Sequence, residues 1–154
     1  MPDIPTSISP VRIAVVQSDP QVGLEQRSAN LTKTLAFARK AIRAGANIIV
    51  LPELANTGYT FNSRAEAYAH AETLRDGSSV AAWAEVARDY NVYVVAGFVE
   101  QEGMKLYNSA VLLGPDGLLG HYRKTHLWNQ EKLWFTPGDL GFPVFETPLG
   151  RIGL

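Results

Sequence analysis

The sequence predicts an α/β fold in which parallel strands come first and an antiparallel meander follows. Two apolar, β-branched runs at residues 11–17 and 47–51 flank a segment with helical periodicity. Strand–helix–strand order implies parallel strands joined by a right-handed crossover. Farther along, apolar runs at 92–100, 106–113 and 118–123 are separated only by short turns, which is typical of antiparallel strands.

The first strand and the helix after it carry the clearest patterns. Residues 11–17 are apolar on both faces, so we expect this strand to be covered from both sides. The helix spans about residues 25–44, where Leu31, Leu35 and Ala38 recur at helical spacing. Gly45 suits the end of that helix.

The other elements follow in chain order. A polar loop at 53–63 precedes a short helix at about 64–74 and a second helix at 78–90, with Ser78 as its N-cap. Residues 124–141 are irregular and rich in aromatic side chains, and a hairpin is expected from 142–147 and 151–154. Without a repeat or a linker, we expect one domain at 11–154 after a flexible, proline-containing tail at 1–10.

Composition excludes several classes of protein. The 154 residues are 46% hydrophobic and 19% charged, which is typical of a globular domain. The net charge of -1 leaves no basic excess for a nucleic-acid partner. No apolar run reaches the roughly 20 residues that span a bilayer, and residues 1–10 lack the features of a signal peptide. We therefore expect a cytoplasmic protein without a nucleic-acid or membrane partner.

The chain contains no cysteine, which excludes disulfides, zinc–thiolate sites and a cysteine nucleophile from these residues. His121 and His126 do not have the spacing that places two ligands on one helix face, so no metal site is predicted. Ser109 lies within a predicted strand without a neighbouring histidine and is interpreted as structural.

Three charged residues occupy positions where chemistry is plausible. Glu53 directly follows the apolar strand 47–51, and Lys124 follows the strand that ends at 123. Functional sites gather beyond the carboxyl ends of strands in layered α/β folds. Glu131 lies in an aromatic-rich loop. Taken singly, a structural explanation is preferred for each: a surface glutamate for Glu53, an ordinary Arg-Lys pair at a strand edge for Lys124, and loop packing for the aromatic residues around Glu131.

Five spaced motifs, taken together, are more specific. They are Ile13-Ala14-Val15-Val16-Gln17; Leu51-Pro52-Glu53-Leu54 with Thr57-Gly58-Tyr59; Tyr107-Asn108-Ser109-Ala110; Tyr122-Arg123-Lys124-Thr125-His126-Leu127; and Glu131 with Phe135-Thr136-Pro137-Gly138-Asp139. In this order they resemble the nitrilase superfamily of carbon–nitrogen hydrolases over residues 11–154. The resemblance implies an αββα sandwich and a reaction without a metal or an organic cofactor.

The resemblance also implies roles for individual residues. Glu53 is expected to act as general base and acid, Lys124 to stabilise an oxyanion, and Glu131 to support them. Tyr59 and Trp128 are expected to line the substrate pocket, although loop packing explains them equally well. The family's nucleophilic cysteine follows a strand of the kind seen at 150–154. We therefore expect this chain to be the N-terminal part of the enzyme and to be inactive alone.

The resulting hypothesis is a hydrolase that cleaves a non-peptide carbon–nitrogen bond of a small amide through a Glu-Lys-Cys centre and a thioester. Two alternatives stay open. One is a nitrilase that converts a nitrile to a carboxylic acid and ammonia, and the other is a binding module that keeps the fold without the nucleophile. The expected partners are a small amide or nitrile substrate and further copies of the chain, as a homodimer or larger homo-oligomer.

Overall fold

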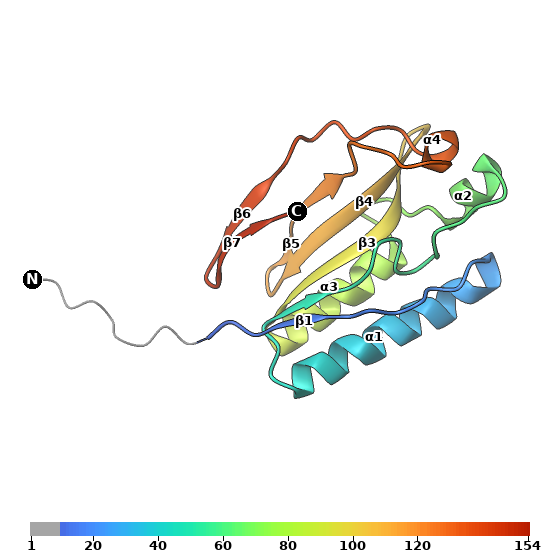
Figure 1. Ribbon diagram of the computed structural model, residues 1–154. Coiled ribbons are helices and arrows are strands. Elements are labelled where there is room, and N and C mark those ends of the chain that lie inside the picture. Colours follow the sequence, from blue (N-terminus) through green and yellow to red (C-terminus); the bar gives the residue numbers. More distant parts are fainter. Residues whose placement is uncertain (1–9) are drawn as a thin grey trace, which may run out of the picture.

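The computed structural model describes residues 10–154, so the predicted tail at 1–10 lies almost entirely outside the described residues. Five strands form one sheet in the order β1-β2-β3-β4-β5 (Figure 1). They are β1 (Ile13–Val15), β2 (Ile48–Val50), β3 (Tyr93–Glu102), β4 (Lys105–Gly114) and β5 (Gly117–Arg123). The first three are parallel and the last three are antiparallel, which confirms the predicted α/β class.

Two helices, α1 (Arg27–Arg43) and α3 (Ser78–Tyr90), cover one face of this sheet. The 3₁₀ turn η1 (Leu24–Gln26) precedes α1, and the short helices α2 (Arg64–His70) and α4 (Glu131–Trp134) lie at one end of the sheet. Figure 1 shows α1 and α3 side by side beneath the sheet, where their apolar side chains pack on β2 and β3. Trp83 of α3 is fully buried there and donates its indole N–H to the Thr34 hydroxyl of α1 at 3.0 Å. No helix in residues 10–154 is long and apolar enough to cross a membrane.

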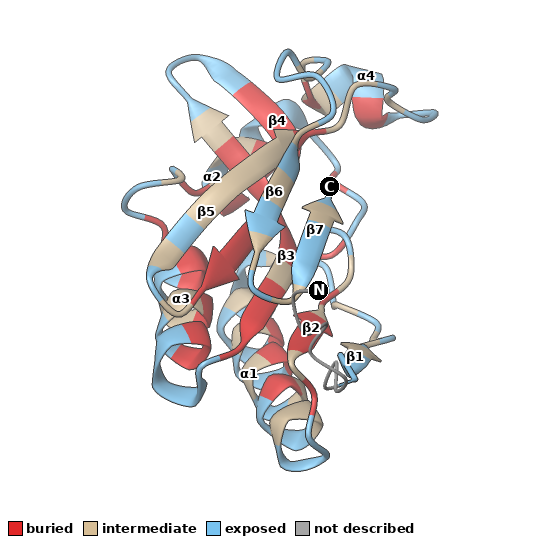
Figure 2. Cartoon of the chain, turned by 90° about the vertical axis from the view of Figure 1, so that its left-hand side faces the viewer, coloured by how far each residue is buried: buried red, intermediate tan, exposed pale blue. Residues whose placement is uncertain are grey.

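The opposite face is covered in part by a hairpin of β6 (Val144–Thr147) and β7 (Gly150–Gly153), as predicted. Phe145 and Ile152 of the hairpin pack over Ile48, Tyr93 and Leu112 of the sheet. In Figure 2, burial is concentrated in β2, β3 and β4 and on the inner sides of α1 and α3. The core therefore lies on both faces of the central strands.

Two predictions, for the first strand and for the helix at 64–74, differ from the described residues. Within residues 10–154, β1 is an edge strand and Ile13 and Val15 are exposed at 58% and 76%, so these residues cover only one of its faces. The helix predicted at 64–74 ends at His70, because Glu72 pairs with β3 instead. Its N–H donates to the Val99 carbonyl at 2.9 Å, and its carbonyl accepts from the Gln101 N–H at 2.8 Å.

Ser78 is not the N-cap of α3 either. Gly77 holds that position, and Ser78 is the first helical residue. The Glu72 carboxylate caps the helix, because it accepts from the Ser79 N–H at 2.9 Å and from the Ser79 hydroxyl at 2.6 Å. A buried carboxylate beside the positive end of a helix replaces the expected serine cap.

His70, at the end of α2, is fully buried and neither ring nitrogen has a hydrogen-bond partner in the described part of the chain. Its ring lies 5.5 Å from that of Phe61, in an apolar cluster. Burial lowers the pKa of His70, and the attraction of Glu66 offsets this only in part. The folded protein therefore holds His70 neutral where an unfolded chain binds a proton.

We predict that the free energy of unfolding falls as the pH drops below about 6.5, the ordinary histidine pKa, because protons then favour the unfolded chain. In the complete protein, His70→Leu should lose less stability than wild type between about pH 7.5 and pH 5.5, as measured by urea unfolding. An identical loss in both proteins would contradict the prediction.

Candidate active site

Glu53 lies one residue beyond Pro52, where the chain leaves β2 and turns across the sheet. The turn rests directly on β3, because the Ala55 N–H donates to the Gly97 carbonyl at 2.8 Å. A Cβ atom at Gly97 would lie 2.7 Å from the Glu53 Cα, so only glycine permits this approach. The packing of the backbone on β3 thus determines where the Glu53 carboxylate lies.

The loop that follows Glu53 is anchored by a buried polar cluster around Glu72. Asn56 is fully buried and donates to Glu72 at 3.2 Å and to the Ser79 hydroxyl at 2.8 Å. Arg27 of α1 also pairs with Glu72. Burial acts to raise the pKa of Glu72, but the donors from Ser79 and Arg27 outweigh it and lower the pKa. An ionised Glu72 therefore ties the Glu53 loop to α1 and α3.

Lys124 lies directly after β5, and its main chain is held on both sides. Its N–H donates to the Asn108 carbonyl at 2.8 Å, and its carbonyl accepts from the Gly138 N–H at 2.9 Å. A Cβ atom at Gly138 would lie 1.9 Å from the Arg123 carbonyl oxygen, so this contact also requires glycine. These contacts hold the segment around Gly138, which follows α4, next to Lys124.

The structure brings the three predicted charged residues together. The Lys124 ammonium donates to Oε1 of Glu53 at 2.8 Å and lies 3.1 Å from Oε1 and 3.0 Å from Oε2 of Glu131. Burial alone would lower the pKa of Lys124, but the hydrogen bonds to Glu53 and Glu131 raise it above its ordinary value. Lys124 is therefore a cation at neutral pH.

Glu131 was predicted in a loop, and the structure corrects this, because it is the first residue of α4. Its side chain is almost fully buried, and Oε2 accepts from the Trp128 N–H at 2.6 Å. Burial would raise the pKa of Glu131, but donation from Trp128, Lys124 and Asn108 lowers it. Glu131 is therefore held as a carboxylate.

Asn108, part of the Tyr107-Asn108-Ser109-Ala110 motif, joins these residues, although no role was predicted for it. It lies within β4 and is almost fully buried. Its side-chain nitrogen lies 2.5 Å from Oε1 of Glu53 and 2.7 Å from Oε1 of Glu131. An asparagine in the middle of an apolar strand needs a partner once buried, and that need was the signal that was missed.

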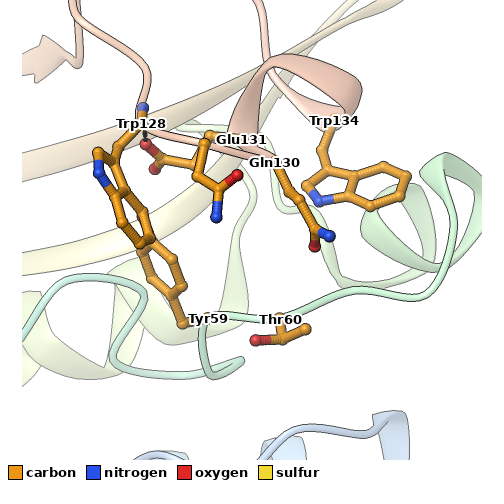
Figure 3. A pocket seen from close by; sticks show the side chains of 7 residues that line it. Tyr59, Thr60, Trp128, Gln130, Glu131 and Trp134 are labelled. Carbon is orange, nitrogen blue, oxygen red and sulfur yellow. Dashed lines mark hydrogen bonds between the residues drawn. The ribbon is translucent and has the colours of Figure 1, made fainter.

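Tyr59 and Trp128, the two predicted substrate-binding residues, line a small cavity of about 130 Å³ beside the charged cluster (Figure 3). Its other lining residues are Thr60, Asn129, Gln130, Glu131 and Trp134. Burial, with Glu53 and Glu131 nearby, raises the pKa of Tyr59 to about 12, so the phenol keeps its proton at neutral pH. Trp128 is 65% exposed and forms only part of a wall.

A second cavity of about 390 Å³ opens on the sheet face that the helices leave free. Its lining includes Glu53, Lys124, Asn108, Tyr122 and Ser109. The Ser109 hydroxyl donates to Glu100 at 2.6 Å, which agrees with its predicted structural role. A carboxylate and a cation therefore face one cavity, and together they can exchange a proton and stabilise developing negative charge.

Residues 10–154 contain no group of three histidine, aspartate or glutamate side chains placed to hold a metal ion.

Arg123, next to Lys124, anchors the end of β5 from within the fold. Its guanidinium donates to both oxygens of the buried Glu100, at 2.5 and 3.0 Å, and to Asp139 at 3.1 Å. It also lies 3.9 Å from the centre of the Tyr107 ring. This bidentate pair links β3 to β5 and fixes the strand end from which Lys124 projects.

With this geometry in view, the class of protein is clear. The model of the carbon–nitrogen hydrolase family matches residues 12–154, and the chain belongs to that family. The resemblance to the nitrilase superfamily is thereby confirmed.

Individual relatives carry several names. The chain is 44% identical over 144 residues to a nitrilase of Pyrococcus abyssi, and the alignment covers 94% of this chain and 54% of the nitrilase. It is 37% identical to omega-amidase NIT2 of Homo sapiens, with 83% of this chain and 49% of that one covered. N-carbamoylputrescine amidase of Arabidopsis thaliana is 34% identical, with coverages of 82% and 44%. The chain thus spans about half the length of the curated relatives it matches.

A solved structure agrees with the predicted fold. The crystal structure of an N-terminal amidase with an Asn-Glu-Ala peptide superposes with a TM-score of 0.78 at 29% identity, covering 88% of this chain and 33% of that one. The α/β fold of the nitrilase superfamily is therefore confirmed for the described residues.

We predict that Arg123→Met lowers the free energy of unfolding of the complete protein by about 3–5 kcal/mol, because Glu100 is left buried without its cation. The matched control is Arg88→Met, which breaks the exposed pair with Asp89 and should cost less than about 1 kcal/mol. Urea unfolding measures both. Equal losses in the two variants would show that the Arg123–Glu100 pair does not hold the sheet together.

Proposed function

We propose that the complete protein hydrolyses a carbon–nitrogen bond of a small carboxamide. The observation that supports this best is the Lys124 ammonium placed between the carboxylates of Glu53 and Glu131, at the mouth of a cavity. In the proposal, Glu53 is the general base and acid, Lys124 stabilises an oxyanion, and Glu131 supports Lys124. A thiol is the nucleophile.

The chain has no cysteine and spans about half the length of its relatives. We therefore propose that the nucleophilic thiol belongs to a cysteine of the complete protein that follows Leu154. Glu53 accepts the thiol proton as the sulfur attacks the carbonyl carbon. The carbonyl π electrons move to oxygen, and the Lys124 cation stabilises the resulting negative charge. When the carbon–nitrogen bond breaks, Glu53 returns the proton to the leaving nitrogen and a thioester remains.

The second half of the reaction uses the same groups. Glu53 removes a proton from water, and the hydroxide adds to the thioester carbonyl, again with the oxyanion beside Lys124. Collapse releases the carboxylic acid, and the sulfur regains its proton from Glu53. Glu131 does not exchange protons in this scheme, because donors from Lys124, Asn108 and Trp128 occupy both of its oxygens. Its charge keeps Lys124 ionised and in position.

One observation favours an enzyme over a binding module. The three charged side chains come from three separate elements and still converge within hydrogen-bonding distance. Bringing these charges together costs desolvation energy, and a site that only binds a ligand does not require such a cluster.

A domain at 11–154, a cytoplasmic location and a homodimer or larger homo-oligomer remain proposals. Light scattering of the complete protein tests the oligomeric state.

An amide is preferred to a nitrile as substrate. Relatives named omega-amidase and N-carbamoylputrescine amidase support an amide, whereas the Pyrococcus abyssi relative is named a nitrilase. The small cavity walled by Tyr59 and Trp128 suits a short acyl group.

We predict that Glu53→Gln and Lys124→Met each reduce turnover of the complete protein to less than about a tenth of wild type, because both groups act on the transition state. The matched control is Lys132→Met, which removes an exposed lysine from α4 and should leave turnover unchanged. Circular dichroism and the thermal midpoint verify folding. Folded variants that retain more activity would remove these residues from the mechanism.

For the choice of substrate, we predict faster ammonia release from a small carboxamide than from the nitrile of the same carbon skeleton. Parallel assays of the complete protein at matched concentrations measure both rates, and Glu53→Gln provides the background. Faster release from the nitrile would reverse the choice and favour the nitrilase alternative.

A further inference from the structure

Asn108 is the neutral member of the charged cluster. It lies in β4 between β3 and β5, opposite Val99, in a strand that is otherwise mostly apolar and buried. Its own carbonyl accepts the Lys124 N–H at 2.8 Å. One residue therefore contacts Lys124 through the backbone and both carboxylates through the side chain.

Both N–H bonds of the Asn108 amide are used on carboxylates, one on Glu53 and one on Glu131. An ionised carboxylate only accepts hydrogen bonds, so the nitrogen of the amide must face the two oxygens. Lys124 donates to the same two Oε1 atoms. Each Oε1 atom thus has one neutral and one charged donor, and the four groups form a closed ring.

The ring leaves the two oxygens of Glu53 unequal. Oε1 accepts from Asn108 and Lys124, whereas no donor in residues 10–154 contacts Oε2. The Glu53 side chain is 44% exposed and borders the larger cavity. In Glu131, by contrast, both oxygens have donors and the side chain is buried.

We propose that Asn108 is a positioning residue, which holds Oε1 of Glu53 together with Lys124 and so leaves Oε2 as the oxygen that accepts and returns the proton. This inference rests on the proposed function and deepens it. A neutral donor favours the ionised form of a carboxylate without competing for its proton. We therefore expect the loss of the Asn108 donor to favour the protonated form of Glu53, because only Lys124 would then donate to Oε1.

The test uses Asn108→Leu, which has a similar volume and no donor, and Asn108→Ser, which keeps one donor. We expect the acidic limb of the pH profile of kcat/KM to move upward by about one pH unit in Asn108→Leu and by less in Asn108→Ser. At the plateau, kcat should fall about tenfold or more in Asn108→Leu while KM stays within about threefold. If Asn108→Leu does not fold, the shift of the acidic limb in Asn108→Ser relative to wild type decides whether Asn108 has this role.

The matched control is Thr34→Val, which removes the buried partner of the Trp83 indole in the helix layer and does not line the cavity. It should lose stability without any movement of the acidic limb. The inference would be overturned if folded Asn108 variants kept the acidic limb of the wild-type pH profile. The same holds if they only lost stability, as Thr34→Val does, because Asn108 would then have a purely structural role.

A titration that does not depend on turnover separates this inference from the proposed function. Carbon-13 NMR of the glutamate carboxyl groups, with the Glu53 signal identified by its loss in Glu53→Gln, gives the protonation midpoint directly. We expect that midpoint to lie about one pH unit higher in Asn108→Leu than in wild type. If wild type hydrolyses no amide but the midpoint moves, the proposed function fails and the positioning by Asn108 stands. An unchanged midpoint overturns the positioning itself.

Discussion

The placement of one cation, Lys124, between two carboxylates is the constraint on which the site depends. An ammonium at a partly covered position is stable only if opposite charges lie within a few ångströms, and Glu53 and Glu131 lie within 3.1 Å of it. These groups are supplied by the end of β2, the end of β5 and the start of α4. The ends of these elements must therefore meet at one point, and the register of the central sheet brings them there.

Buried polar groups fix the first two of those ends. Glu72 ties the Glu53 loop to the helix layer through Asn56, and the Arg123–Glu100 pair ties the end of β5 to β3. Each buried group would destabilise the fold if a partner were missing, so these contacts allow few alternative arrangements. The site residues, which lie just beyond β2 and β5, in β4 and at the start of α4, are consequently held in place by supporting hydrogen bonds, as precise chemistry requires.

The two faces of the sheet serve different purposes. Helices α1 and α3 cover one face with a continuous apolar core that includes Trp83 and Phe98. The other face carries the β6–β7 hairpin, the charged cluster and the cavity that Glu53, Lys124 and Asn108 line. Asn108 belongs to a strand that contributes to both faces, because side chains alternate along β4. Leu113 packs in the helix-side core, whereas Leu112 packs beneath the hairpin.

The sequence by itself determined the fold class, the order of the strands and the family. Strand and helix periodicities are local, so the parallel pair around 13–50 and the meander of 93–123 were predictable, as were the positions of Glu53 and Lys124 after strands. Only the tertiary structure decided the rest. The partners of Glu72, Asn108 and Arg123 lie on other elements, so no local pattern could show that Glu72 caps α3 or that Asn108 bridges two carboxylates. Exposure of β1 was likewise undecidable, since an apolar strand looks the same at the edge of a sheet as at its centre.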